Sequence, residues 1–371
     1  MTLRVGKLVY GIIKLLPCLL AVLLASSCSS DVNSDEQKGN KTLVTLTIAA
    51  SGNAATASRA VSGNSSTITR ADVSDPINKD YYISDLTVLI FDESGVVIGS
   101  ATKLARDLSP TQDGKITIPV LTRAAKNCTV YAIANALALN GGNTPFAGIA
   151  TLSALKSKVK TYTNADDINK ESCLLMMGKT ADKSFDTTNS GSAAAISLQR
   201  LASRIDFNFT VKNDWITGFP IVVDSYQLCH APLSAFYAPA DMNAITLPQG
   251  AAYVDYTLQN TNTIANPYTA YVYANPATTA QDATYLLIKA HSQASPIDTR
   301  KIWQSDFKVY LNGITGLDDY KLLPNYHYSV NITVQGSSQA HHGVIASYKA
   351  YPYMAGGSIA SWTTENRPTD M

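Results

Sequence analysis

The sequence predicts an all-β protein built from two antiparallel β-sandwiches with short helices. Short stretches of alternating apolar and polar residues recur along the chain and are separated by turn residues, which favours a sandwich over a βαβ fold. Tyrosine is unusually frequent, with 20 residues against 8 Phe and 3 Trp, and aromatic and β-branched residues favour the half-buried surface of a sheet. With 371 residues, the chain is long enough for two domains.

The first 28 residues have the pattern of a lipoprotein signal peptide. Basic residues precede an apolar run, residues 15–24, that is too short to span a bilayer, and small residues then lead to Cys28. We therefore expect lipidation of Cys28, which would become the first residue of the exported protein. The leucine usually found three residues before the cysteine stands four before it, at Leu24, so an ordinary secretory signal that contains a cysteine is the alternative.

An amphipathic strand is predicted shortly after this signal. Residues 29–41 are polar, acidic and without aromatic side chains, so we expect them to act as a flexible tether. The next segment, residues 43–50, alternates between apolar and threonine positions, which is the period of a strand with one buried face. The residues expected on that face are Val44, Leu46 and Ile48.

A loop that a protease could reach follows this strand. Residues 51–75 are rich in Ser, Ala, Gly, Asn and Thr and contain two isolated arginines, Arg59 and Arg70. Segments of this composition are typically exposed and open to cleavage. We treat residues 42–70 together as a first strand that could be removed and its cleavable loop.

The rest of the first half continues with strand patterns and one helix pattern. A helix is predicted over residues 151–160, where Leu152, Leu155 and Val159 recur at helical spacing. Strands are predicted at residues 83–91, with a hairpin turn leading to 96–98, and at 115–121 and 128–134. We assign the N-terminal sandwich to residues 71–190.

A second sandwich is predicted after a segment rich in Ser, Gly and Ala, residues 185–195. We assign it to residues 191–335. Its predicted strands are residues 205–211, 221–228, 270–273, 284–290, 307–311 and 326–334. No repeat at a fixed period is visible, which disfavours a solenoid or a propeller.

The C-terminal tail, residues 336–371, keeps strand chemistry after the last strand of the second sandwich. If that sandwich is complete, the tail has no partner within its own chain. A free strand at one end and a removable strand at the other together suggest polymerisation by strand exchange, in which main-chain hydrogen bonds supply the affinity. The alternative is that both segments are ordinary edge strands of a monomer. The residues expected in the donated strand are Val344, Ile345, Ala346, Tyr348 and Ala350.

Residues that could carry chemistry are sparse, and we expect neither catalysis nor a cofactor nor a metal. The net charge is +1 with 15% charged residues, which argues against a nucleic-acid partner. The stretch Met177-Gly178-Lys179-Thr180 lacks the earlier glycine of a phosphate loop. The adjacent His341 and His342 have no further ligand close in sequence. Three cysteines lie in apolar neighbourhoods and are expected as buried thiols, with one disulfide as the alternative: Cys128, Cys173 and Cys229.

Several patches, taken in order, resemble the fimbrillin family, the subunits of Bacteroidales fimbriae also called type V pili. The patches span nearly the whole chain: residues 42–50, 58–60, 69–71, 83–92, 130–136, 198–205 and 323–328. The resemblance implies two tandem transthyretin-like β-sandwich domains, export as a lipoprotein to the outer membrane, and trimming by an arginine-specific protease. Arg59 matches the family pattern best and Arg70 is a close second.

The same resemblance implies an assembly mechanism and a location. Loss of the first strand would open a groove, into which the C-terminal strand of a neighbouring fimbrial subunit inserts. The precursor would be a lipid-anchored outer-membrane protein and the product an extracellular fimbria that serves adhesion to a host or bacterial surface.

Two other functions compete with this interpretation. The first is a surface glycan-binding lipoprotein, because exposed aromatic side chains of tyrosine-rich sandwiches can stack on sugars. Its platform would be formed by Tyr253, Tyr256, Tyr268, Tyr271 and Tyr273. The second is a secreted enzyme, which the sparse polar chemistry disfavours. Neither needs the tail after residue 335.

Overall fold

The computed structural model describes residues 41–50, 74–112, 114–164, 166–186, 194–260, 267–311, 320–337 and 343–352. Within these ranges the chain is mostly β-strand, and the prediction of an all-β fold is confirmed. None of its helices there is long and apolar enough to cross a membrane. Several residues discussed above lie outside the described residues, among them Cys28, Arg59, Arg70, His341 and His342.

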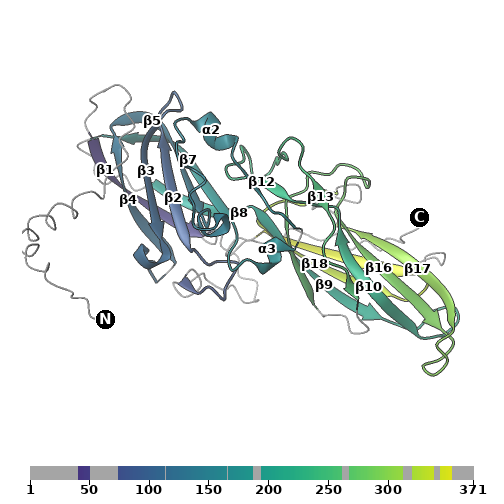
Figure 1. Cartoon of the computed structure of the whole chain (residues 1–371). Coiled ribbons are helices and arrows are strands. Elements are labelled where there is room, and N and C mark those ends of the chain that lie inside the picture. Colours follow the sequence, from purple (N-terminus) through teal and green to yellow (C-terminus); the bar gives the residue numbers. More distant parts are fainter. Residues whose placement is uncertain are drawn as a thin grey trace, which may run out of the picture. The chain divides into compact units, whose positions relative to one another are not determined.

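The first sheet contains seven strands and closes on itself as a barrel. Neighbouring strands follow the order β1 (Lys41–Ala50), β4 (Lys115–Arg123), β3 (Val97–Leu104), β2 (Asp85–Phe91), β5 (Ala125–Ala134), β7 (Met176–Phe185) and β8 (Ala194–Arg200). Figure 1 shows β1 and β4 side by side, and β2 lies between β3 and β5. The barrel is filled by alternating aliphatic side chains, because every second residue of each strand faces inward.

Two weak seams divide this barrel into two layers. Among the described residues, β3 and β4 share only the pair Gly99↔Thr122, and β7 and β8 share only Met176↔Arg200 and Met177↔Gln199. All other neighbours are joined by longer ladders. The barrel therefore behaves as a sandwich of a three-stranded layer, β4–β1–β8, on a four-stranded layer, β3–β2–β5–β7.

The second half forms a sandwich of two four-stranded sheets. One sheet has the order β15 (Tyr268–Tyr273), β9 (Ala202–Val211), β18 (Tyr326–Val334) and β19 (Val344–Pro352). The other has the order β14 (Gln259–Asn260), β10 (Ile221–Cys229), β16 (Tyr285–Gln293) and β17 (Lys301–Tyr310). Aromatic side chains from both sheets meet in the core, as in the tilted contact of Phe209 with Tyr226, whose ring centroids are 5.3 Å apart.

Two parallel pairings depart from the antiparallel prediction. β1 runs parallel to β8, and β9 runs parallel to β18. Parallel neighbours need a long crossover, and in both cases the crossover passes through other strands of the same sandwich. The arrangement as two tandem transthyretin-like domains stays a prediction.

The short elements lie between the sandwiches' main strands. Helix α2 (Leu152–Lys156) is capped by Thr151, whose side chain accepts a hydrogen bond from Ala154 N. The predicted helix over residues 151–160 is therefore too long, because Val159 belongs to strand β6. The remaining short elements are η1 (Ala105–Asp107), η2 (Ala138–Asn140), α3 (Asp167–Lys170), β6 (Val159–Thr161), β11 (Ala231–Pro232), β12 (Ser234–Phe236) and β13 (Tyr253–Val254).

The two halves of the chain share one of their two cores. The first core lies inside the barrel, between its two layers. The second core begins on the other face of β2 and β5, with residues such as Phe91 and Tyr131, and continues through the second sandwich. β6 from the first half also pairs with β12 from the second. The sandwiches are therefore packed together by apolar contact and not joined by a linker alone.

The change from one sandwich to the other occurs at Leu201. β8 ends at Arg200 and pairs with β1 and β7, whereas β9 begins at Ala202 and pairs with β15 and β18. The sheets thus change about ten residues later than the predicted division at residue 190. The full domain assignment stays a prediction, but β8, which follows the predicted division and contains the apolar-alternating residues from Ile196, belongs to the first sheet.

Candidate functional site

Strand β1 is the middle strand of the three-stranded layer. It forms nine antiparallel residue pairs with β4, from Lys41↔Arg123 to Ala49↔Lys115, and five parallel pairs with β8. Among the described residues, β4 has the single bridge Gly99↔Thr122 on its other side. Pro119 in β4 has no N–H to donate, which is tolerated where a strand lies at the edge of a layer. β1 is thus not an edge strand but the link that holds β4 to β8.

One face of β1 is completely buried. Val44, Leu46 and Ile48 are 0% exposed and pack in the barrel core, so the prediction of a buried face at these residues is confirmed. Burying an aliphatic side chain of this size contributes about 1.5 to 3 kcal/mol, or about 5 to 9 kcal/mol for the three. On the opposite face Leu43 is 54% exposed and pairs across the ladder with Leu121, which is 53% exposed.

Without β1, its neighbours β4 and β8 would keep few main-chain pairings to the rest of the barrel. β4 would keep its bridge to β3, where Thr122 Oγ1 donates to Ile98 O at 3.3 Å. The bridge is tight, because a Cβ on Gly99 would come within 2.7 Å of Thr122 Cβ. β8 would keep its two pairs with β7. The space between β4 and β8 would then be one strand wide, lined by apolar residues and bordered by unpaired main-chain groups.

A shallow hollow lies on the outer side of this layer, above the seam between β3 and β4. It is lined by Lys41, Val97, Ile98, Gly99, Ser100, Leu121, Thr122 and Arg123. The hollow exists because β3 and β4 separate on either side of the Gly99↔Thr122 bridge. It lies beside the end of β1 at which the strand begins, where Lys41 pairs with Arg123.

The C-terminal strand β19 is paired within its own chain. It runs antiparallel to β18 over nine residue pairs, from Tyr326↔Pro352 to Val334↔Val344. The expectation that the tail lacks a partner in its own chain is therefore wrong for Val344–Pro352. β19 is nevertheless the last strand of its sheet. Val344 and Ala346 face the core, at 1% and 2% exposed. Whether Ile345, Tyr348 and Ala350 enter a neighbour stays a prediction.

The tyrosines considered for a glycan platform do not form one exposed surface. Tyr256 and Tyr273 are buried, and burial raises the pKa of both phenols well above the usual value. The Tyr256 hydroxyl donates to Tyr271 O at 2.5 Å. Tyr268 stacks on Phe207 with ring centroids 5.8 Å apart. Lys79 Nζ lies over the Tyr271 ring, 4.5 Å from its centroid, and the Tyr253 ring packs against His230 with centroids 4.1 Å apart, so all five rings have partners within the chain.

All three cysteines of the described part of the chain are buried free thiols. The prediction of buried thiols is confirmed, and no disulfide joins them. Burial raises the pKa of Cys173 to about 12, with a further contribution from Asp85, and burial raises that of Cys128 and Cys229 to about 11. Thiols with such pKa values are almost entirely protonated at neutral pH and react slowly. Among the described residues no cluster of His, Cys, Asp or Glu could hold a metal ion.

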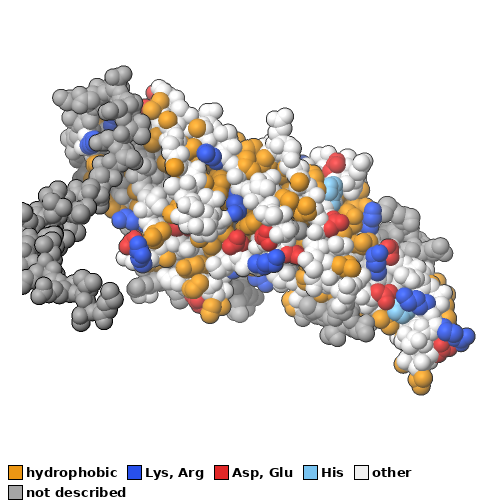
Figure 2. Space-filling view, in the orientation of Figure 1, with side chains coloured by type: hydrophobic (Ala, Val, Ile, Leu, Met, Phe, Trp, Pro, Cys, Tyr) orange, Lys and Arg blue, Asp and Glu red, His pale blue; other side chains and the backbone are white. Residues whose placement is uncertain are grey.

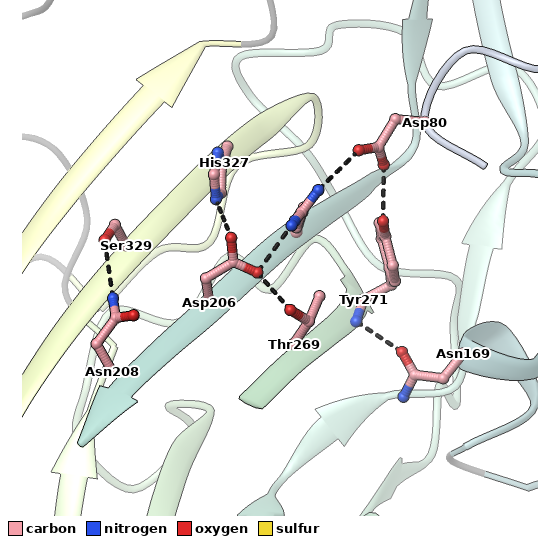
Figure 3. Close-up of polar contacts among 9 residues, drawn as sticks. Asp80, Asn169, Asp206, Asn208, Thr269, Tyr271, His327 and Ser329 are labelled. Atoms are coloured by element: carbon pink, nitrogen blue, oxygen red, sulfur yellow. Dashed lines mark hydrogen bonds and ion pairs between the residues drawn. The ribbon is translucent and has the colours of Figure 1, made fainter. Parts of the chain in front are cut away.

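A polar network that sequence reasoning missed joins the segment before β2 to the second sandwich. Asp80 receives an ion pair from Arg204 of β9, with Nη1 and Oδ2 3.1 Å apart. It also accepts a hydrogen bond from the Tyr271 hydroxyl of β15 at 2.8 Å, and Tyr271 N donates to Asn169 Oδ1 (Figure 3). Asp80 is 8% exposed, so this pairing holds the chain firmly where it enters the first sheet.

The network continues along β9 to the strand that neighbours β19. Asp206 pairs with Arg204 at 3.0 Å and with His327 Nε2 of β18 at 2.7 Å, and it accepts a hydrogen bond from Thr269 (Figure 3). Burial alone would raise the pKa of Asp206, but the hydrogen bonds from His327, Arg204 and Thr269 outweigh burial and hold the pKa well below its usual value. His327 lies opposite Tyr351 of β19 in the β18–β19 ladder.

Comparison with known proteins gives one family and one fold. Residues 42–207 match the family of the major fimbrial subunit protein (FimA). The match begins in β1 and ends in β9, and so covers the whole of the first sheet. A search of curated protein sequences finds no match.

Solved structures with the same fold come from Parabacteroides distasonis and Porphyromonas gingivalis. A candidate cell adhesion protein from Parabacteroides distasonis superposes with a TM-score of 0.61 at 16% identity, over 85% of this chain and 98% of that one. The fimbrilin FimA of Porphyromonas gingivalis superposes with a TM-score of 0.55 at 14% identity, over 85% and 99%. A fimbrial assembly protein from Parabacteroides distasonis gives 0.51 at 14%, over 84% and 96%.

The superpositions show a common fold over most of the chain. The match of residues 42–207, however, rests on sequence. It confirms the resemblance to the fimbrillins, a family of structural fimbrial subunits and not of enzymes.

Proposed function

We propose that this protein is a structural subunit of a cell-surface fimbria that polymerises by strand exchange. The precursor is exported as a lipoprotein through Cys28 and is trimmed after Arg59 or Arg70 by an arginine-specific protease. Trimming removes β1, and the C-terminal strand of a neighbouring subunit takes its place. The polymer is an extracellular fimbria that serves adhesion.

The proposal is supported by the burial and pairing of β1, together with the sequence of the segment that follows it. The strand is completely buried on one face and links β4 to β8, so a stable monomer would keep it. Yet the chain between β1 and the next described residue, Ser74, contains both arginines in a sequence typical of cleavable loops. A buried strand joined to the domain by a cleavable segment is what strand exchange requires.

The energetics favour refilling of the groove. Loss of β1 forfeits about 5 to 9 kcal/mol of apolar burial and exposes unpaired main-chain groups along β4 and β8. A strand from another molecule that follows the same direction would restore both ladders. Because the inserted strand is held along its whole length, we expect dissociation to be very slow.

The donor must first leave its own sheet. β19 is an edge strand, so its release disrupts one ladder, that with β18. Its release also uncovers Val344 and Ala346, whose side of the strand could then face the core of the acceptor. Strand exchange thus replaces the single ladder of β19 with β18 by two ladders, with β4 and β8 of the acceptor.

The test of trimming and assembly is gel electrophoresis without boiling, before and after limited trypsin treatment of purified precursor. N-terminal sequencing identifies the product. We expect a heat-sensitive ladder together with a new start at Ala60 or Ala71. A single monomer band after clean trimming would contradict the proposal.

The test of the donor is a disulfide that holds β19 in place. Asn331 of β18 and Ser347 of β19 are directly opposite in the ladder, so the pair Asn331→Cys and Ser347→Cys should close under oxidation. The trimmed, oxidised variant should remain monomeric and should polymerise after reduction. Asn331→Cys alone serves as the control and should polymerise in both states. Polymers from the oxidised pair would show that Val344–Pro352 is not the donor strand.

A further inference from the structure

An exposed apolar surface lies at one end of the second sandwich. We call it the distal crown. Its members come from the ends of β9 and β17 and from two loops: Val211, Trp215, Ile216, Ile297 and Ile302, which are 40%, 55%, 63%, 94% and 48% exposed. On the face that Figure 2 shows, this end carries separate apolar side chains among basic and acidic ones. Large exposed apolar side chains at one end of a domain are candidates for an interaction surface.

The crown is built on a structured loop. Asp214 is 4% exposed, and its carboxylate accepts hydrogen bonds from Ile216 N at 2.9 Å, from Thr217 N at 3.0 Å and from Trp303 Nε1 at 2.6 Å. These bonds fix the loop between β9 and β10 and turn Trp215 and Ile216 outward. The second loop lies beside it, since Gln293 N donates to Pro220 O. Two large side chains are therefore presented in a fixed position, at a low entropic cost of binding.

The crown surrounds the point at which the C-terminal strand leaves the sandwich. Val334 of β18 is opposite both Val211 of β9 and Val344 of β19. The turn between β18 and β19 is therefore at the crown end, and the other ends of these strands border the first sandwich. Trp215 N donates to Gln335 O in this turn, and a Cβ on Gly336 would come within 3.0 Å of the Trp215 indole nitrogen.

If β19 leaves its own sheet by pivoting at this turn and inserts into a neighbouring subunit, that subunit comes to lie next to the distal crown. If the donor follows the direction of β1, its first residues lie where β1 begins, beside Arg123. The hollow between β3 and β4 is at that position, with the half-exposed Leu121 on its wall. Trimming also removes Lys41 from the hollow, because this residue belongs to β1.

We propose that the distal crown of one copy docks on the β3–β4 hollow of the next copy, with Trp215 as its anchor. The partner is a second copy of this chain, and the contact extends the interface that the inserted strand creates. The inference rests on the proposed strand exchange, which supplies the attachment, whereas the crown fixes the orientation of one subunit relative to the next. Buried aromatic anchors of this kind dominate many interfaces.

The first test compares polymerisation rates of trimmed subunits. The double variant Trp215→Gln, Ile216→Asn should polymerise about tenfold more slowly than the unaltered chain. It should bind a synthetic peptide of residues 343–371 as well as before, since its groove is unchanged. Leu258→Asn, at an exposed leucine outside the crown, is the matched control and should polymerise normally.

The outcomes separate the two proposals. Unchanged polymerisation of the crown variant would overturn the docking inference and leave strand exchange intact. Failure of the unaltered trimmed subunit both to polymerise and to bind the peptide would overturn strand exchange, and the crown inference with it.

The second test locates the partner surface by cross-linking. One copy carries Trp215→Cys and the other carries Leu121→Cys; the native thiols are buried and should stay silent. The two variants are trimmed, mixed and mildly oxidised. They should yield a disulfide-linked dimer that survives boiling and disappears on reduction. The pair Leu258→Cys and Leu121→Cys is the control and should give none. Polymers that form without the Trp215–Leu121 disulfide would show that the distal crown does not dock on the β3–β4 hollow.

Discussion

Truncation of a single buried residue in β1 should destabilise the precursor and leave the trimmed subunit unaffected. The Leu46 side chain is 0% exposed in the barrel core. Replacing a buried leucine by alanine costs about 2 to 5 kcal/mol, from lost burial and the cavity that remains. The matched change Leu43→Ala alters the same strand on its exposed face and should cost no more than about 0.5 kcal/mol.

Urea unfolding followed by circular dichroism measures both variants in two forms. The first form is the intact precursor, and the second is the trimmed protein after separation from the released fragment. We expect Leu46→Ala to lower the free energy of unfolding of the precursor only, because residue 46 is absent from the second form. A difference that persists after trimming would show that β1 stays in place and would refute the mechanism. Equal stability of the Leu46→Ala and Leu43→Ala precursors would refute the burial argument itself.

Three further predictions concern the rest of the chain. The native thiols of the trimmed subunit should not react with a thiol reagent at pH 8 until urea unfolds the protein, because burial raises their pKa values to about 11 to 12; rapid labelling of the folded protein would contradict this. The pKa of Asp206 is depressed in the folded protein, so the stability that this carboxylate contributes is present above its unfolded pKa of about 3.9 and is lost as the pH falls through the folded pKa. Asp206→Asn should therefore flatten the acid limb of a curve of unfolding free energy against pH. An unchanged acid limb would show that other carboxylates determine the acid sensitivity. Deletion of residues 343–371 should abolish polymers and leave a folded monomer, as judged by electrophoresis and circular dichroism; polymers of the truncated chain would exclude the tail as donor.

The sequence predicted β1 well but not its neighbours. The alternation of residues 43–50 identified the strand and its buried face, because the period of two is a local property of the chain. Its position between β4 and β8 depends on ladders to residues about 70 and 150 positions away, and no local pattern encodes those partners. The same holds for β19, whose strand character was visible and whose pairing with β18 was not.

Non-local pairing also explains the errors in boundaries. The helix predicted over residues 151–160 ends at Lys156, because the next residues pair with β12 of the second half. The strand that begins near Ile196 reads as the start of a new sandwich, since it follows a loop-like segment. Its register with β1 places it in the first sheet instead.

Almost nothing in the sequence predicted the polar network around Asp80. Its members are spread from Asp80 to His327 and meet through the packing of the sandwiches. One signal was available: Arg204 and Asp206 are two positions apart at the start of the strand predicted over residues 205–211, and residues two apart in a strand lie on one face of it. Charged residues on the same face of a strand indicate a polar pairing there but do not identify the partners.

Binding of the C-terminal strand by the trimmed subunit tests the strand-exchange mechanism most directly. A labelled peptide of residues 343–371 is titrated into precursor and into trimmed subunit, both carrying the oxidised Asn331→Cys, Ser347→Cys pair that keeps β19 on β18, and its fluorescence polarisation is recorded. We predict one peptide bound per trimmed subunit with very slow release, and no binding to the precursor, in which β1 fills the groove. Equal binding to both forms, or binding to neither, would contradict the mechanism.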